Sequence, residues 1–152
     1  MSRFLRGLFA GAGLLAMLTL PACGPVEDTR PGRPVAHRQE AFREILRAFE
    51  PMGIQLRTES FEAEAFLRHA TKLEAVKEAP WSYFGADTQY PPSQSKDRLW
   101  QEKERFEALR DAFLRAVTDL REAAQSREEG KARAAWQTVE TTCRDCHKPY
   151  KY

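Results

Sequence analysis

Cysteine and histidine are scarce in this chain, with three of each among 152 residues. Three cysteines exclude a framework of several disulfides. Two of them and one histidine fall within the closing stretch TTCRDCHKPYKY, where Cys143, Cys146 and His147 span five residues. So close a spacing is typical of a chemical site and unlike a structural crosslink.

Other features are missing altogether. No stretch alternates apolar and polar residues with a period of two, and no repeat recurs at a fixed spacing, which excludes sheet and repeat architectures. A carboxylate pair, a nucleophile beside a base and a phosphate-binding loop are also lacking, so we do not expect an enzyme. Without residues 1–22, which hold two of the 24 basic residues and no acid, the charges balance at 22 against 22. This balance gives no electrostatic reason to expect a nucleic-acid partner.

The first 22 residues have the pattern of an export signal. Arg3 and Arg6 precede the uncharged run GLFAGAGLLAMLTL, which as a helix would span about 21 Å, less than the roughly 30 Å hydrocarbon layer of a bilayer. The run ends in LPAC, which resembles the lipobox of bacterial lipoproteins and predicts that Cys23 is the lipidated mature N-terminus. Simple cleavage is the alternative. Both predict export to the periplasm, and lipidation adds a membrane anchor.

Residues 23–34 are rich in proline and glycine and predict a flexible tether, so the folded domain is expected over residues 35–152. Four helical patterns follow. The first begins near Ala36 and either ends at Pro51 or continues after a break, and the second begins after Ser60, a candidate N-cap. A long connection over residues 81–96 comes next and is expected to pack Trp81 and Phe84 inward.

The third pattern begins near Asp97 and is expected to stop at Gly130, and the fourth begins near Lys131 and is expected to stop at Pro149. Four amphipathic helices with one long connection predict an all-α four-helix bundle. Cys143 and Cys146 fall on the apolar face of the last helix, where a ligand between helices would lie.

Three kinds of chemistry could use the terminal motif. A zinc site needs about four ligands, but only His37 and His69 are left to complete it, and neither lies in a second ligand pair. A redox dithiol obtains its low thiol pKa at the start of a helix, whereas this pair lies near a helix end, which would raise the pKa. Covalent haem fits best, because two thiols one turn apart can each add to a porphyrin vinyl group and the next histidine can bind the iron.

The motif in its context resembles the cytochrome c' group of class II c-type cytochromes. The resemblance rests on the C-terminal CxxCH, on HRQEAF in the first helix and on PWSYFG after the second, and it covers residues 35–152. It implies one covalent haem c, held by Cys143 and Cys146 with His147 as the axial iron ligand, and a bundle that is often dimeric through its first two helices. It also places Arg38 near the haem propionates and a basic residue, here Lys151 in place of the usual arginine, close to the haem.

Function depends on the residue that faces the other side of the iron. By resemblance that residue lies four places after Arg38, where this chain has Phe42, and a phenyl ring cannot coordinate iron. Phe42 is also the first residue of an apolar stripe on the first helix, so we expect it to be an ordinary core residue as well as part of the haem wall. Met52, His37 and His69 are the other candidate ligands, but none of them occupies the expected place.

We therefore expect a five-coordinate iron in a protein that transfers electrons or binds NO or CO, with Phe42 as a steric gate and little stable binding of O2. The expected redox partners are small redox proteins or a membrane oxidoreductase. A low-spin, six-coordinate electron carrier is the alternative.

Overall fold

Helices dominate residues 26–152, the part of the chain that this computed structural model describes. The elements in order are α1 (Pro34–Arg57), α2 (Ala63–Val76), the 3-10 helix η1 (Trp81–Tyr83), α3 (Arg98–Gln101), α4 (Lys103–Gln125) and α5 (Glu129–Tyr150). Within these residues, β-type pairing is limited to one isolated bridge between Ser95 and Lys151. The expected signal and Cys23 lie outside the described residues. None of the helices from residue 26 onward is long and apolar enough to cross a membrane.

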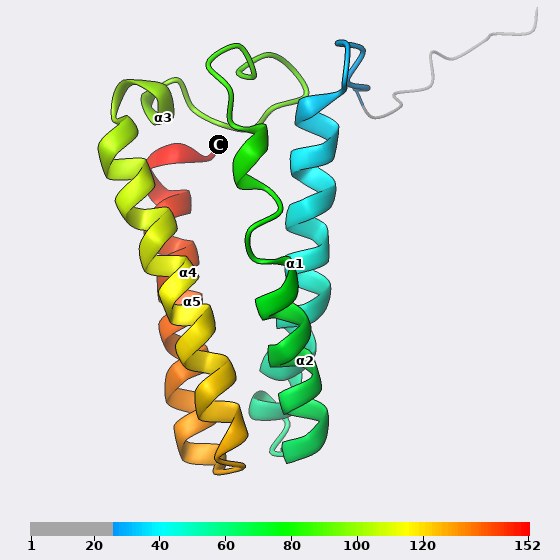
Figure 1. The fold of residues 1–152 in the computed structure, drawn as a ribbon, viewed down its shortest axis with the longest axis vertical. Helices are drawn as coiled ribbons and strands as arrows, with labels where there is room; N and C mark the ends of the chain where they lie inside the picture. Colours follow the sequence, from blue (N-terminus) through cyan, green and yellow to red (C-terminus); the bar gives the residue numbers. More distant parts are fainter. Residues whose placement is uncertain (1–25) are drawn as a thin grey trace, which may run out of the picture.

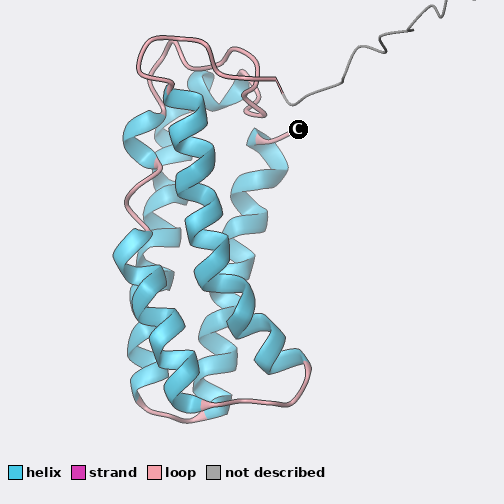
Figure 2. Ribbon diagram, turned by 90° about the vertical axis from the view of Figure 1, so that its right-hand side faces the viewer, coloured by secondary structure: helices cyan, strands magenta, loops and turns pink. Residues whose placement is uncertain are grey.

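The four long helices form an up-and-down bundle (Figure 1). α1 packs along α2, α2 against α4, and α4 along α5. The connection between η1 and α3, α3 itself and the C-terminus gather at one end, drawn uppermost in Figures 1 and 2, and we call it the upper end. The prediction of an all-α four-helix bundle is confirmed.

The main core lies between the four long helices, and a smaller apolar cluster of Leu99, Phe106 and Tyr150 lies near the upper end. In the main core, Phe49 of α1 stacks on Trp136 of α5, with ring centroids 4.9 Å apart and planes at 7°. This stack joins the first and last helices, so the apolar stripes seen in the sequence do meet in the interior.

The first helix continues through Pro51 without ending. A proline removes one helical hydrogen bond, but Phe49 before it and Met52 and Leu56 after it are buried in the same core. Of the two outcomes that the sequence left open, continuation is therefore correct. Packing on both sides of Pro51 stabilises the helix across the lost bond.

Two helix boundaries differ from expectation. Ser60 is not the N-cap of α2, because the helix begins after Glu62 and the Ser60 hydroxyl lies 2.8 Å from the Thr58 hydroxyl. Gly130 does not end the third helix, since it is the second residue of α5. Arg127 instead takes the left-handed conformation in that turn, with φ of 61°, so the glycine signal pointed a few residues too far along the chain.

The expected third helix is two helices with a break at Glu102. The Glu102 carboxylate accepts hydrogen bonds from Arg98 Nε at 2.7 Å and from Tyr150 Oη at 3.0 Å. The break thus ties α4 to the end of α5. That end also extends one residue beyond Pro149, to Tyr150.

The chain before α1 is docked, although residues 23–34 were expected to be a flexible tether. Asp28 is 4% exposed and accepts hydrogen bonds from Ala36 N at 3.0 Å in the first turn of α1 and from Tyr90 Oη at 2.8 Å. The Arg30 guanidinium lies 4.4 Å from the centre of the Tyr90 ring. From Asp28 onward the segment therefore belongs to the folded domain, and the expectation of a flexible tether is wrong for this part.

Candidate functional site

The functional residues meet in a cavity of about 500 Å³. Its walls come from α1, α3, α4, α5, η1 and the connection that follows η1. The volume lies within the range of small-molecule and cofactor sites. Most of the wall is aromatic or aliphatic, contributed by Phe42, Ile45, Leu46, Phe49, Trp81, Phe84, Leu99, Phe106, Leu109 and Phe113.

The last two turns of α5 bring Cys143, Cys146 and His147 to this cavity. The two cysteines are unpaired and half-buried, with Cys143 against the main core and Cys146 against the upper cluster. Burial raises the pKa of both thiols to about 11. Burial and the nearby Lys151 lower the pKa of His147, which favours the neutral imidazole that binds metals.

Phe42 lies on the α1 side of the cavity, as the sequence predicted. Its ring meets Trp81 edge-on, with centroids 5.5 Å apart, and Phe84 at 6.2 Å. Trp81 is itself held by a hydrogen bond from its indole N–H to the Lys77 carbonyl at 2.7 Å. The predicted inward packing of Trp81 and Phe84 is confirmed, and both support the ring of Phe42.

Arg38 also lines the cavity and is 4% exposed. Its Nη1 donates to Tyr83 O and Thr88 Oγ1, both at 3.0 Å, and its Nη2 donates to Thr88 O at 3.2 Å and Ser93 Oγ at 2.8 Å. The guanidinium carbon lies 4.5 Å from the centre of the Phe84 ring. Arg38 therefore organises the connection after η1, and none of these four partners carries a negative charge.

The cavity wall includes four cationic side chains and no carboxylate. The cations are Arg38, Arg43, Arg110 and Lys151. Arg43 and Arg110 have carboxylate partners nearby, Glu40 and Asp111. An apolar cavity with a basic rim matches a flat apolar ring with acidic substituents, which describes haem and its two propionates. The residues present thus fit haem c.

Several residues considered from the sequence do not reach this cavity. Met52 is fully buried in the main core, and His37 stacks on Tyr83 with centroids 5.5 Å apart. Neither they nor His69 line the cavity.

Sequence reasoning missed the residues that hold Arg38, namely Thr88 and Ser93. It also missed Arg43 and Arg110 on the cavity wall. The connection has no helical period that would have singled out its polar residues, although their concentration in DTQYPPSQS was visible. Arg43 lies one residue after Phe42, so an outward-facing position was the natural interpretation.

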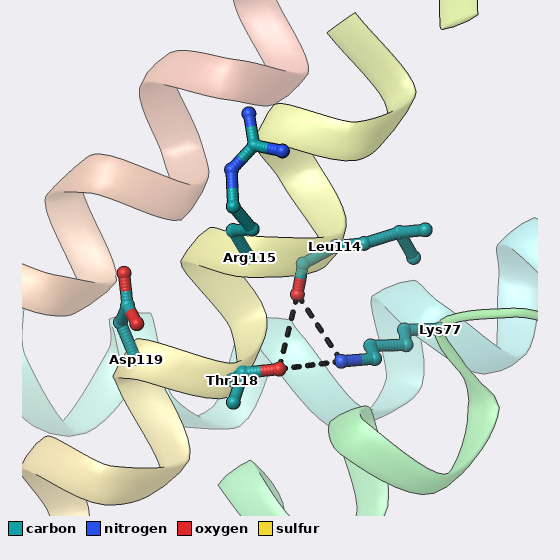
Figure 3. Close-up of a pocket in the computed structure, with 5 residues that line it drawn as sticks. All are labelled: Lys77, Leu114, Arg115, Thr118 and Asp119. Atoms are coloured by element: carbon teal, nitrogen blue, oxygen red, sulfur yellow. Dashed lines mark hydrogen bonds between the residues drawn. The ribbon is translucent and has the colours of Figure 1, made fainter. Parts of the chain in front are cut away.

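A second, shallower hollow of about 280 Å³ lies between the end of α2 and the middle of α4 (Figure 3). There the Lys77 ammonium donates to Thr118 Oγ1 at 2.6 Å, to Glu74 Oε1 at 3.0 Å and to Leu114 O at 3.2 Å. These three acceptors use all three ammonium protons. Lys77 is therefore a structural tie between α2 and α4 and keeps no ammonium proton for a ligand.

The geometry disfavours the other two interpretations of the motif. Among residues 26–152, no group of three or more His, Cys, Asp or Glu side chains is gathered as a zinc site requires. Thiol pKa values raised to about 11 are the opposite of what a redox dithiol needs.

Comparison with known proteins agrees with the cavity. The profile of the family described as Cytochrome C' matches residues 33–151. The chain belongs to the cytochrome c' family. It is 24% identical over 123 residues to a cytochrome c' of Alcaligenes xylosoxydans xylosoxydans, a match that covers 80% of this chain and 95% of the relative.

Solved structures of cytochromes c' share the fold. One from Shewanella frigidimarina superposes with a TM-score of 0.77 at 27% identity, covering 81% of this chain and 97% of the other. One from Rubrivivax gelatinosus gives 0.76 at 23% identity, covering 83% and 100%. A mutant from Alcaligenes xylosoxidans, in complex with nitric oxide, gives 0.74 at 25% identity, covering 82% and 98%. As a cytochrome c' with both cysteines of its motif present, the chain has covalent haem c as its cofactor.

Proposed function

We propose that this cytochrome c' is exported to the periplasm and has a five-coordinate haem iron that exchanges electrons or binds NO or CO. When bound, haem c supplies an iron that takes up and releases one electron and binds diatomic gases. The residues of this chain hold the group, shape the space on each side of it and control access.

Cys143 and Cys146 are proposed to hold the haem covalently, and His147 to bind the iron from the α5 side. Each thiol adds its sulfur and its proton across one vinyl double bond, so no group leaves. One helical turn separates the cysteines, and both line the cavity beside His147.

The observation that carries the proposal is the position of Phe42. It reaches the cavity from α1, whereas the motif reaches it from α5, and a phenyl ring offers no lone pair to a metal. Met52 lies in the main core and His37 stacks outside the cavity, so both support an open sixth position. A wall of Phe42, Ile45 and Phe49 offers no hydrogen bond to bound O2, which favours NO and CO.

Arg38 and Lys151 are proposed to face the haem propionates. Four hydrogen bonds use the four Nη protons of Arg38, and the Nε proton is not among them. The charge of Arg38 therefore acts on an acidic substituent at the cavity rim, with at most one direct hydrogen bond. Lys151 supplies a flexible second charge.

We further propose that the protein carries out no catalytic cycle of its own, and that Cys23 carries a lipid that anchors it to the membrane. Its redox partners are then small redox proteins or a membrane oxidoreductase. Dimerisation through α1 and α2 is part of the same proposal, because these helices pair along their length and α1 leaves Ile54 exposed.

Absorption and EPR spectra of the purified holoprotein test the iron. High-spin ferric and ferrous spectra, and a ferrous form that binds CO and NO at once on mixing, are expected. A low-spin spectrum in the absence of added ligand would show a sixth protein ligand and remove the gas-binding function. Mass spectrometry of the membrane fraction tests the lipid on Cys23.

A further inference from the structure

Residues Pro92–Lys96, which we call the strap, cross the upper end of the molecule between α1 and the end of α5. On the α1 side, Gln39 Nε2 donates to Pro92 O at 3.0 Å, and Arg38 Nη2 donates to Ser93 Oγ at 2.8 Å. Gln94 and Ser95 of the strap line the haem cavity. The strap is thus fastened to the helix that carries Phe42.

The other side of the strap is fastened to the residues that follow the haem motif. Lys96 N donates to Tyr150 O at 2.9 Å, Tyr152 N donates to Gln94 O at 3.0 Å, and Ser95 pairs with Lys151 in an antiparallel bridge. Lys151 N in turn donates to His147 O at 2.9 Å. Lys151 therefore links the strap to the backbone of His147, the proposed axial ligand.

The last turn of α5 needs such a support. Pro149 lies inside this turn and has no N–H to donate to the carbonyl four residues before it. The turn is also the last one of α5, and helices fray most readily at their ends. Without an external tie, the backbone that carries His147 would be the least constrained part of the cavity wall.

Ser93 is the junction of the two sides. Its hydroxyl oxygen accepts from Arg38 Nη2 at 2.8 Å and from Ser95 N at 3.1 Å, which uses both of its lone pairs. A continuous path therefore runs from Arg38 through Ser93 and Ser95 to Lys151, and from there to His147.

We propose that Ser93 is a positioning residue that fixes the height and tilt of His147 relative to the wall that carries Phe42. It acts through the strap and does not touch the haem iron. This inference rests on the proposed ligation of iron by His147. Its consequence is that the strength of the iron–histidine bond, and with it the reactivity of the open side, depends on a serine hydroxyl in a connection far from the motif in sequence.

The test compares the holoprotein with its Ser93→Ala variant by two measurements. Amide hydrogen exchange at Lys96 and Tyr152 is expected to become roughly tenfold faster, because the hydrogen bonds of the strap lose their anchor. The iron–histidine stretching band in the resonance Raman spectrum of the ferrous form is expected to shift and broaden. Ser93→Thr keeps the hydroxyl and is expected to restore both signals.

Ser82→Ala is the matched control, since Ser82 lies in η1, is exposed and makes no hydrogen bond through its hydroxyl among the described residues. A chain that ends at Lys151 lacks the hydrogen bond from Tyr152 N to Gln94 O and so loosens the strap from its α5 side. This shortened chain replaces Ser93→Ala in the test if that variant does not take up haem. An unchanged band in both the Ser93→Ala and the shortened chain overturns the inference, as does an equal change in Ser82→Ala. A lower melting temperature with an unmoved band also overturns it, since the role would then be structural only. Absence of any iron–histidine band in the unaltered protein would instead contradict the proposed function.

Discussion

The indole of Trp136 lies directly against the backbone of Gly53, where a Cβ atom would come within 2.6 Å of Trp136 Cζ2. Phe49, one turn earlier on α1, also stacks on the Trp136 ring with centroids 4.9 Å apart, so Trp136 has little room to move. Gly53 is thus required by the close approach of α1 and α5, although it lies in the middle of a helix.

Gly53→Ala is expected to destabilise the fold. Overpacking costs about 1–3 kcal/mol, and the better helix propensity of alanine offsets at most about 1 kcal/mol of it. Gly130→Ala is the control, because nothing lies within 4 Å of its Cβ position, and a gain of up to about 1 kcal/mol is expected there. Denaturant unfolding of both variants measures the difference, and equal stabilities would contradict the close approach.

Asp28 is expected to stabilise the docking of the N-terminal segment in a pH-dependent way. Burial raises the pKa of its carboxyl, but hydrogen bonds from Ala36 N, Tyr90 Oη and Arg30 N outweigh this, so the pKa is lowered overall. A lowered folded-state pKa gives stability that is present above the unfolded value of 3.8 and is lost as the pH falls through the folded value.

Asp28→Asn is therefore expected to lower the melting temperature by a few degrees at neutral pH, with the difference from the unaltered protein shrinking below pH 3.8. Glu27→Gln is the control, since Glu27 is exposed. A difference of constant size across this pH range would show that the carboxylate charge of Asp28 is not what holds the segment.

Phe42→Met is expected to convert the iron from high spin to low spin, because it places a thioether sulfur on the wall opposite His147. The absorption and EPR spectra report the change, and CO binding by the ferrous form is expected to slow at least tenfold because the sulfur must leave first. Leu46 lies one turn further along α1 and lines the same cavity, so Leu46→Met checks which residue of α1 faces the iron. A low-spin spectrum from Leu46→Met alone would mean that Leu46, not Phe42, faces the iron.

Removal of both motif cysteines, by Cys143→Ala with Cys146→Ala, is expected to abolish covalent haem. Each single variant is expected to keep haem through one thioether, with the α band of its pyridine haemochrome at longer wavelength because one vinyl group is retained. Haem staining of a denaturing gel shows whether covalent haem is present, and the pyridine haemochrome spectrum shows whether one or two thioether links hold it. Stained protein from the double variant would contradict the assignment of the thioether links.

Lys77→Met is expected to cost about 1–3 kcal/mol of stability, because it leaves the half-buried Glu74 carboxylate without its cation. The Lys77 side chain is only 12% exposed, so solvent screens the pair little. Lys72→Met is the matched control: its pair with Glu44 spans 3.9 Å and is exposed, so a change below about 0.5 kcal/mol is expected. Similar costs in urea unfolding for the two variants would mean that burial adds nothing to the pair at Lys77.

Helix boundaries show where local signals were insufficient. Pro51 and Gly130 are strong breakers in isolation, yet α1 continues through the first and α5 includes the second. Burial of Met52 and Leu56 beyond the proline, and a left-handed Arg127 in the turn, decided these points. The burial of Met52 and Leu56 depends on contacts with other helices, which no local pattern contains.

The sequence by itself determined the helical class, the apolar faces and the cofactor motif, because periodicity and the chemistry of CxxCH are local properties of the chain. The resemblance to cytochromes c' also predicted Phe42 on the cavity wall, four places after Arg38 on the first helix. Only the tertiary structure decided what Arg38 binds, that Asp28 docks the N-terminal segment and that Ser93 joins the strap to both sides of the site. These contacts join residues up to 62 positions apart through a connection without helical period, so they arise only when the bundle brings its ends together.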